Sequence, residues 1–553
     1  MCLTRLRLEL AGLAGALSLV AGPAAQSPAP PQPATPTFRA ATRLVQVSVV
    51  VHDKDGRAVP DLTRGDFTLF EDGKAQPIQI FSVESDRGTA PAPAPPSPGT
   101  FSNRVDGRAA GAVTVILFDR LNTRFEDQAQ ARAQVVTYLG QIQRNDRVAL
   151  YVLESNTVRV LHDFTSDAAS LLRVLSRYRG DTSGELAASE AEVPEFMPSG
   201  LAALDADMAA FLKESTERVA AQFTMHRVDS TTAALEAIAN HLAGIRGRKN
   251  LVWVSSAFPL VIVDERGQSR TVAREVSRAT RAVNNANIAI YPVDARGLIG
   301  AFASPPGAGK PVFTTLSTTQ PNMDAMRTIA EDTGGRAFVN SNDITSAVRR
   351  AIDDGRLTYV LGYYPAHGQW NSAFHQIRVK VSRPGLDVRH RKGYLALPAQ
   401  QASGARSAAL RDALRSPLEA TGLGLMAHVA RIDTKGATAT EGQTAGDVRI
   451  AIRIDPGSVT LEKAGSLWEG AFDLLIGQST STATFSKDLD TTVNLQFPSD
   501  KRDQVLAEGL TVNRTIALRA DVYRLLIVVR DVATGAMGSV IIPADQVHAA
   551  LAK

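Results

Sequence analysis

The stretch "VTVILFDRLNTRFEDQAQARAQVVTYL" (residues 113–139) contains the pattern that decides the fold. A mainly apolar run ends at Asp119, and a short polar turn follows. Phe125, Ala129, Val136 and Leu139 then repeat at the spacing of one helix face. A continuous apolar strand is typical of a sheet that is covered on both faces. The stretch therefore predicts a buried strand followed by a helix.

The same alternation continues along the chain. Further strands are expected at "DRVALYVLES", "NLVWVSS" and "NIAIYPVDA", and helices at "SDAASLLRVLSRY", "TVAREVSRATRAVNNA" and "NDITSAVRRAID". This order predicts an α/β domain with a doubly wound, mostly parallel sheet. We therefore expect residues 113–118 and 251–254 to lie in one sheet.

Alternating apolar residues and turn signals predict antiparallel β modules on both sides of this domain in the sequence. The predicted organisation is a signal peptide at 1–25, a Pro/Ala-rich linker at 26–40, a small β unit at 41–84, a flexible linker at 85–110, the α/β domain at 111–356 with a helical insertion at about 180–227, a β segment at 357–398, a linker at 399–415 and a β-sandwich at 416–553.

Composition limits the classes of function and partner. The net charge of +4 over 553 residues gives no reason to expect a nucleic-acid partner. Cys2 is the only cysteine, so a disulfide or a cysteine metal site within one chain is excluded. Arg5 and Arg7 precede a short apolar stretch, which is typical of a signal peptide, although an uncleaved anchor helix is an alternative. We expect an exported protein, periplasmic or extracellular, with no membrane span in the mature chain.

Enzyme motifs are missing from the sequence. It contains no H-E-x-x-H zinc motif and no phosphate-binding P-loop, and no G-x-S-x-G nucleophile elbow lies at a strand-to-helix junction. The adjacent Asp353 and Asp354 and the basic run "RHRK" (residues 389–392) are interpreted as solvated surface. A non-enzymatic protein is expected, and a hydrolase whose catalytic groups converge only in three dimensions is a further alternative.

The order of "VTVILFDRLNT", "DRVALYVLES", "GRKNLVWVSS", "NIAIYPVDARG" and "IAEDTGGRAFV" resembles a von Willebrand factor A domain. With the preceding valine-rich β segment and the later "TYVLGYYP" and "RHRKGYLA", residues 43–396 are similar to the VWFA-related proteins described from Acidobacteria. The resemblance implies an adhesion-type protein that docks a protein or glycan ligand at the carboxyl edge of its sheet. The alternative is a structural scaffold of an envelope assembly with no functional cleft.

Many domains of this family hold Mg²⁺ or Mn²⁺ at a metal-ion-dependent adhesion site, which begins with Asp-x-Ser-x-Ser. In this chain Asp119 matches the Asp and Thr123 matches the second Ser, but Leu121 replaces the first Ser. A leucine cannot ligate a hard cation, which takes oxygen ligands. The resemblance therefore implies a degenerate site with weak or absent divalent metal.

The remaining positions of the family pattern are less well matched. Thr232 is the best placed loop threonine, with Thr231 an alternative, and Ser255 or Ser256 stands where a second Asp is usual. Asp294 follows the next strand. The predicted ligand-binding residues are Asp119, Asn122, Thr123, Thr232, Ser255 and Ser256, and the predicted metal ligands are Asp119, Thr123, Thr232 and Asp294.

Structural roles for the same residues stay open. Asp119 could cap the helix that begins near Arg124, or accept backbone N–H groups within the turn. Thr232 could be the N-cap of an apolar-faced helix, and Asp294 could be a turn residue. Ser255 and Ser256 would then be ordinary loop hydroxyls.

Overall fold

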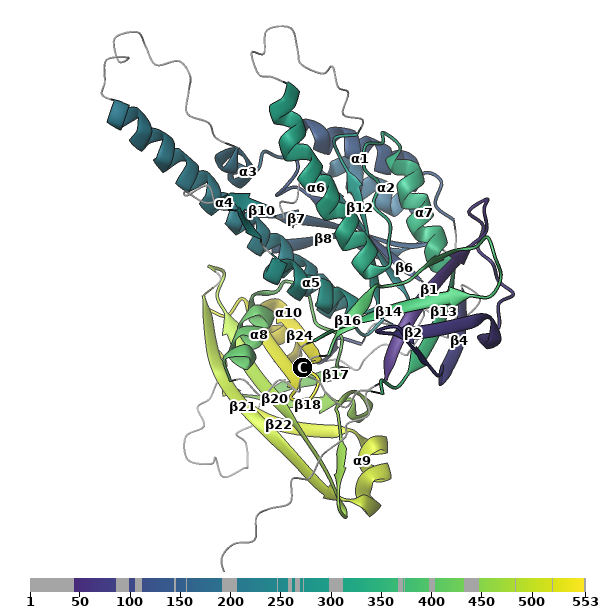
Figure 1. The fold of residues 1–553 in the computed structure, drawn as a ribbon. Coiled ribbons are helices and arrows are strands. Elements are labelled where there is room, and N and C mark those ends of the chain that lie inside the picture. Colours follow the sequence, from purple (N-terminus) through teal and green to yellow (C-terminus); the bar gives the residue numbers. More distant parts are fainter. Residues whose placement is uncertain are drawn as a thin grey trace, which may run out of the picture. The chain divides into compact units, whose positions relative to one another are not determined.

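The computed structural model describes residues 44–85, 99–104, 112–143, 146–155, 157–190, 206–245, 247–256, 261–263, 269–271, 273–297, 312–366, 371, 373–396, 403–431, 447–482, 484–519 and 521–551. The predicted signal peptide and the Pro/Ala-rich linker at 26–40 lie outside these residues. The described chain is a mixed α/β structure with several sheets (Figure 1).

The central sheet has the strand order β12-β9-β6-β7-β8. Its strands are β6 (Val113–Asp119), β7 (Arg147–Glu154), β8 (Thr157–Thr165), β9 (Lys249–Ser255) and β12 (Ile288–Asp294). Four of them run parallel, and β8 pairs antiparallel with β7. Because β6 and β9 pair directly, the prediction that residues 113–118 and 251–254 share a sheet is confirmed.

The two faces of β6 pack into two different apolar cores. Val115 and Leu117 join a core with residues of α4, α5 and α6, whereas Ile116 and Phe118 join a core with residues of α1, α2 and α7. This two-sided burial explains the continuous apolar run of β6. The helices are α1 (Phe125–Leu139), α2 (Ala168–Arg177), α3 (Gly184–Ser189), α4 (Ala206–Leu242), α5 (Ala273–Asn285), α6 (Val312–Thr333) and α7 (Ile344–Arg356), and a hairpin of β10 (Val261–Val263) and β11 (Ser269–Thr271) lies between α4 and α5 in the chain.

The small β unit at 41–84 and the β segment at 357–398 form one β module rather than two. Its sheets are β15-β1-β13-β4 and β16-β14-β2-β3. Val47 pairs with Leu361, and Leu69 with Val379, so both halves supply one apolar core. The strands are β1 (Val45–His52), β2 (Phe67–Glu71), β3 (Lys74–Gln76), β4 (Ile80–Ser85), β13 (Leu357–Tyr363), β14 (Phe374–Val381), β15 (Asp387–Arg389) and β16 (Gly393–Leu395).

The C-terminal sandwich has two sheets around one apolar core, with the orders β22-β18-β17-β5 and β19-β20-β23-β24, and β21 pairs with β20. Its elements are β5 (Thr100–Ser102), α8 (Ser403–Arg415), β17 (Leu425–Arg431), β18 (Asp447–Ile454), β19 (Glu462–Ala464), β20 (Leu467–Ser479), β21 (Phe485–Pro498), α9 (Arg502–Glu508), β22 (Leu510–Ala517), β23 (Arg524–Asp531), β24 (Met537–Pro543) and α10 (Ala544–Leu551).

Two predicted linkers contain regular structure. Within the linker predicted at 85–110, β5 pairs with β17. The partly buried Phe101 of β5 packs against the sandwich core. Within the linker predicted at 399–415, α8 buries Leu410 and Leu414 against the sandwich strands. Among the described helices, none combines the length and apolar character needed to cross a membrane.

Candidate functional site

Asp119 lies at the carboxyl end of β6 and is 1% exposed. Its Oδ1 accepts the backbone N–H of Asn122 at 3.0 Å and the Asn122 side-chain amide at 3.0 Å. Its Oδ2 accepts Nε1–H of Trp253 at 2.9 Å and the hydroxyl of Ser255 at 2.8 Å. Both carboxylate oxygens therefore already receive strong donors from the turn after β6 and from β9.

Arg227 of α4 supplies a buried positive charge beside this carboxylate. Its Nε donates to Oδ1 of Asn122 at 3.0 Å, and Arg227 is 4% exposed. Burial lowers the pKa of Arg227, and the charge of Asp119 acts to raise it. Burial also raises the pKa of Asp119, while the donors from Asn122, Ser255 and Trp253 lower it. Asn122 thus connects an acid on β6 to a guanidinium on α4.

The hydroxyl groups predicted for this edge lie around the same turn. Thr123 Oγ1 accepts the backbone N–H of Ser256 at 3.3 Å, and the Ser256 hydroxyl donates to Asp127 of α1 at 2.9 Å. Asp119, Asn122, Thr123, Ser255 and Ser256 are therefore brought together at the carboxyl ends of β6 and β9, and all are nearly fully buried.

Thr232 does not lie in a loop or at an N-cap. Helix α4 is continuous from Ala206 to Leu242, so Thr232 lies inside it, beyond the insertion predicted at about 180–227. The Thr232 hydroxyl donates to the main-chain oxygen of Val228 at 3.0 Å, as hydroxyl groups within helices often do. Thr231, the alternative, is closer to the turn, because its Oγ1 accepts Nδ2–H of Asn122 at 2.8 Å.

Asp294 ends β12 and is held by Arg296. The Arg296 guanidinium donates to both carboxylate oxygens, at 2.9 and 2.8 Å, and its backbone N–H donates to Oδ1 at 3.0 Å. This geometry matches the turn role considered for Asp294. Asp119 likewise accepts a turn N–H, while the N-cap residue of α1 is Arg124. The helix-capping role of Asp119 is therefore wrong, and the turn role is correct.

The side chains at this edge do not fit a Mg²⁺ or Mn²⁺ site of the family type. Leu121 contributes a buried hydrocarbon where a hydroxyl would be needed, and Ser255 donates to Asp119 instead of providing a second carboxylate. Asp294 is bound to Arg296, and Thr232 donates within its own helix. In the part of the chain that the structure describes, no group of three His, Cys, Asp or Glu residues could hold a metal ion.

Exposed residues lie directly after the buried turn. Phe125 is 51% exposed at the start of α1, and the mainly exposed Arg124 pairs with Glu190 at 3.0 Å. Arg120 lies 3.6 Å from Glu154. Phe125 was identified from the sequence only as a member of an apolar helix face. The position of an aromatic residue at the first helical residue after a turn is the signal that could have indicated its exposure.

No protein-family model matches the chain, and no curated protein matches it. Among solved structures, the chain is similar to the BatB protein of Bacteroides thetaiotaomicron, with 13% identity over 44% of this chain and 97% of that chain and a TM-score of 0.22. It is also similar to the SpRpn10 VWA domain, with 14% identity over 43% and 94% and a TM-score of 0.20. TM-scores this low establish neither a shared fold nor a shared function.

Proposed function

We propose that this chain is an exported, non-enzymatic binding protein of the von Willebrand factor A-like type, which docks a protein ligand at the carboxyl edge of its central sheet. The observation that carries the proposal is the hydrogen-bond network around Asp119, which joins β6, β9 and α4. Chain order reverses between β6 and β9, and ligands of open α/β sheets bind at such a point.

The proposed docking works without a divalent cation. The network holds the turn at residues 119–124 in one conformation, and Arg227 partly offsets the charge of Asp119. The ligand then contacts the residues that the turn presents, Arg124 and Phe125. Aromatic residues and arginine are enriched among the residues that dominate protein interfaces. The buried side chains position this surface rather than touching the ligand.

A capture experiment with the full chain tests the docking edge. Wild type, the double variant Arg124→Ala/Phe125→Ala and the control Phe211→Ala are immobilised and exposed to an envelope extract. Phe211 is a suitable control because it is a 62% exposed aromatic residue of α4. A protein ligand should bind wild type and control and be lost from the double variant. Equal capture by all three proteins contradicts the proposal.

The second candidate is a structural scaffold of an envelope assembly. It is favoured by the near-complete burial of Asp119, Asn122, Thr123, Ser255 and Ser256, which leaves few polar groups of this edge accessible. Under this alternative the β module and the C-terminal sandwich carry the contacts. Equal capture by the three proteins, in the experiment above, would therefore support the scaffold.

A further inference from the structure

A cavity of about 290 Å³, here called the α5 cleft, lies between α5 and the strands β14 and β16 of the β module. Asn284 and Asn285, at the end of α5, line it, and β12 begins three residues after Asn285 at Ile288. The cleft therefore lies toward the amino ends of the parallel strands, whereas Asp119 lies at their carboxyl ends. It is a different site from the proposed docking edge.

We propose that the α5 cleft binds a neutral carbohydrate of one or two sugar rings. This site is independent of the proposed protein docking. The cavity volume is at the lower limit of small-molecule sites, which are about 300–1,000 Å³, so a ligand of this size fits it and a folded partner does not.

An aromatic surface forms one side of the cleft. Phe374 is 57% exposed, so much of its ring is accessible to a ligand. Tyr394 of β16 and Val276 of α5 also line the cleft. A side chain at Gly393 would collide with the Phe374 ring and with the main chain of His375. Glycine at this position therefore allows the Phe374 ring to lie over it. The C–H face of a sugar ring packs well against such a flat apolar ring.

Polar groups with unused hydrogen-bonding capacity form the other side. Arg281 donates Nε–H to the main-chain oxygen of Ser277, and its terminal N–H groups have no acceptor among the described residues. The carboxylate of Asp332 receives no hydrogen bond from any residue that the structure describes. Burial raises the pKa of Asp332, and Lys392 lowers it. The amide of Asn285 adds a donor and an acceptor.

This combination favours a polyhydroxylated ligand over a charged one. Arg281 can only donate, and an ionised Asp332 can only accept, while a sugar hydroxyl does both. One positive and one negative group cancel, so the cleft does not select for a net charge. Hydroxyl groups on one edge of a sugar can therefore satisfy both side chains while its face covers Phe374.

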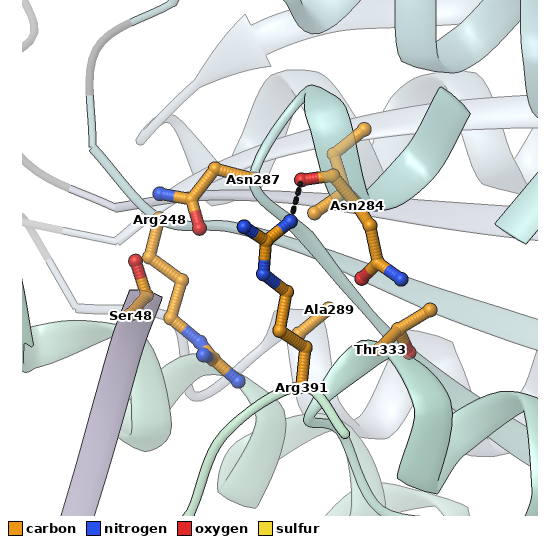
Figure 2. A pocket seen from close by; sticks show the side chains of 8 residues that line it. Ser48, Arg248, Asn284, Asn287, Ala289, Thr333 and Arg391 are labelled. Carbon is orange, nitrogen blue, oxygen red and sulfur yellow. Dashed lines mark hydrogen bonds between the residues drawn. The ribbon is translucent and has the colours of Figure 1, made fainter. Parts of the chain in front are cut away.

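A second, smaller cavity beside the α5 cleft does not offer a competing site. This cavity, lined by Ser48, Arg248 and Arg391, has a volume of about 10 Å³ and holds at most a water molecule. Figure 2 shows Arg391 donating to the main-chain oxygen of Asn284, at 3.3 Å, which holds the end of α5 against the β module.

Calorimetric titration of the full chain tests the cleft. Cellobiose, maltose and N,N′-diacetylchitobiose are the probes, and the dipeptide Gly-Phe is the competing class. At least one disaccharide should bind saturably with a dissociation constant of about 1 mM. Phe374→Ala should weaken this binding about fivefold, as the loss of one aromatic contact would, and Phe211→Ala should leave it unchanged.

Further variants separate binding from folding. Asn285→Ala changes an exposed helix position, and Arg281→Ala removes a half-buried cation, so thermal melting of each variant shows whether it is folded. Weakened disaccharide binding by a folded variant of either kind supports the proposal. The proposal is overturned if no disaccharide binds saturably, if Gly-Phe binds in their place, or if Phe374→Ala and Arg281→Ala bind as tightly as wild type.

Discussion

At the scale of single residues, the Asp119 carboxylate is an acceptor for donors from two elements. Asp119→Asn keeps the shape but places an N–H₂ group either against the donors of Asn122 or against those of Trp253 and Ser255. It also leaves Arg227 without its nearby negative charge. The free energy of unfolding should fall by about 2–4 kcal/mol, as measured by urea denaturation. Asp503→Asn, at an exposed position, should change it little. Equal losses in the two variants would contradict this role of Asp119.

Divalent cations should not stabilise the protein. Because both oxygens of Asp119 accept protein donors and Leu121 lacks an oxygen, a thermal-shift titration with Mg²⁺, Mn²⁺ or Ca²⁺ at millimolar concentration should leave Tm unchanged. Asp119→Ala is the control. A saturable rise in the Tm of wild type that Asp119→Ala abolishes would show that a metal site exists after all.

Glu419 should make stability depend on pH. Burial raises the pKa of its carboxyl group to about 7, and the N–H of Ile541 donates to Oε1 at 2.7 Å. The unfolded chain has the lower pKa, so the folded state binds more protons between the two values. The contribution of Glu419 to the free energy of unfolding is fully present below the pKa of the unfolded chain. It is lost as pH rises through about 7, by about 3 kcal/mol.

Glu419→Gln keeps an acceptor for Ile541 but does not titrate. Urea unfolding of this variant between pH 5 and 8 should therefore show a weaker decline in stability than wild type. Parallel pH dependences of the two proteins would exclude Glu419 as the cause. His241, which bonds to the main-chain oxygen of Glu419, is unchanged in both proteins and so does not affect the comparison.

Residue positions at the sheet edge were predictable, but their bonding partners were not. Asp119 and Ser255 each end an apolar strand, so parallel pairing was enough to place them together. Thr232 was misassigned because "DSTT" has the composition of an N-cap, whereas α4 continues through it. The contribution of Arg227 depends on which face of α4 packs against β6, and the spacing of apolar residues does not specify this for one arginine.

At the scale of elements, a buried ion pair joins α7 to β15. Asp354 accepts N–H groups from Arg389 at both oxygens, and the hydroxyl of Tyr291 donates to it at 2.7 Å. The interpretation of Asp354 and of the start of "RHRK" as solvated surface was therefore wrong. Adjacent charges on a helix look exposed in the sequence, because nothing local indicates that a strand of another module covers one of them.

Replacing only one member of this ion pair should lower the free energy of unfolding more than replacing both. Arg389→Met leaves Asp354 buried without its cation, and the free energy of unfolding should fall by about 3–5 kcal/mol. The double variant Arg389→Met/Asp354→Leu should lose less, because neither member of the pair is left buried without the other. Both values come from urea denaturation of the full chain. A double variant less stable than Arg389→Met alone would contradict the argument.

At the scale of the whole molecule, the β module is built from two distant parts of the chain. A protease site introduced at residues 86–98 tests this arrangement. After cleavage the fragment that ends at β4 should stay bound in gel filtration, because β1 pairs with β13 and β2 pairs with β14. Val47→Lys, at a buried position of β1, should release it, and Gln46→Lys, at an exposed position of the same strand, should not. Release of the wild-type fragment would contradict the shared core.

Sequence periodicity was sufficient for the type of most elements and insufficient for their assembly. The alternating valines of β1 predicted a strand, yet they could not identify β13 as its partner. The short β5 was hidden within a proline-rich composition, and it is held by Phe101 and by pairing with β17 rather than by its own propensity. Long-range pairing of this kind adds contacts that a local pattern does not contain.

The pairing of β5 with β17 and of β1 with β13 has a consequence for biosynthesis. Both N-terminal strands leave the ribosome long before the segments that complete their sheets. A nascent chain therefore carries the valine-rich β1 and the short β5 unpaired through most of its translation, and such unpaired strands template aggregation. Efficient production of this protein should depend on a chaperone that keeps the early strands apart until β13 and β17 have been made.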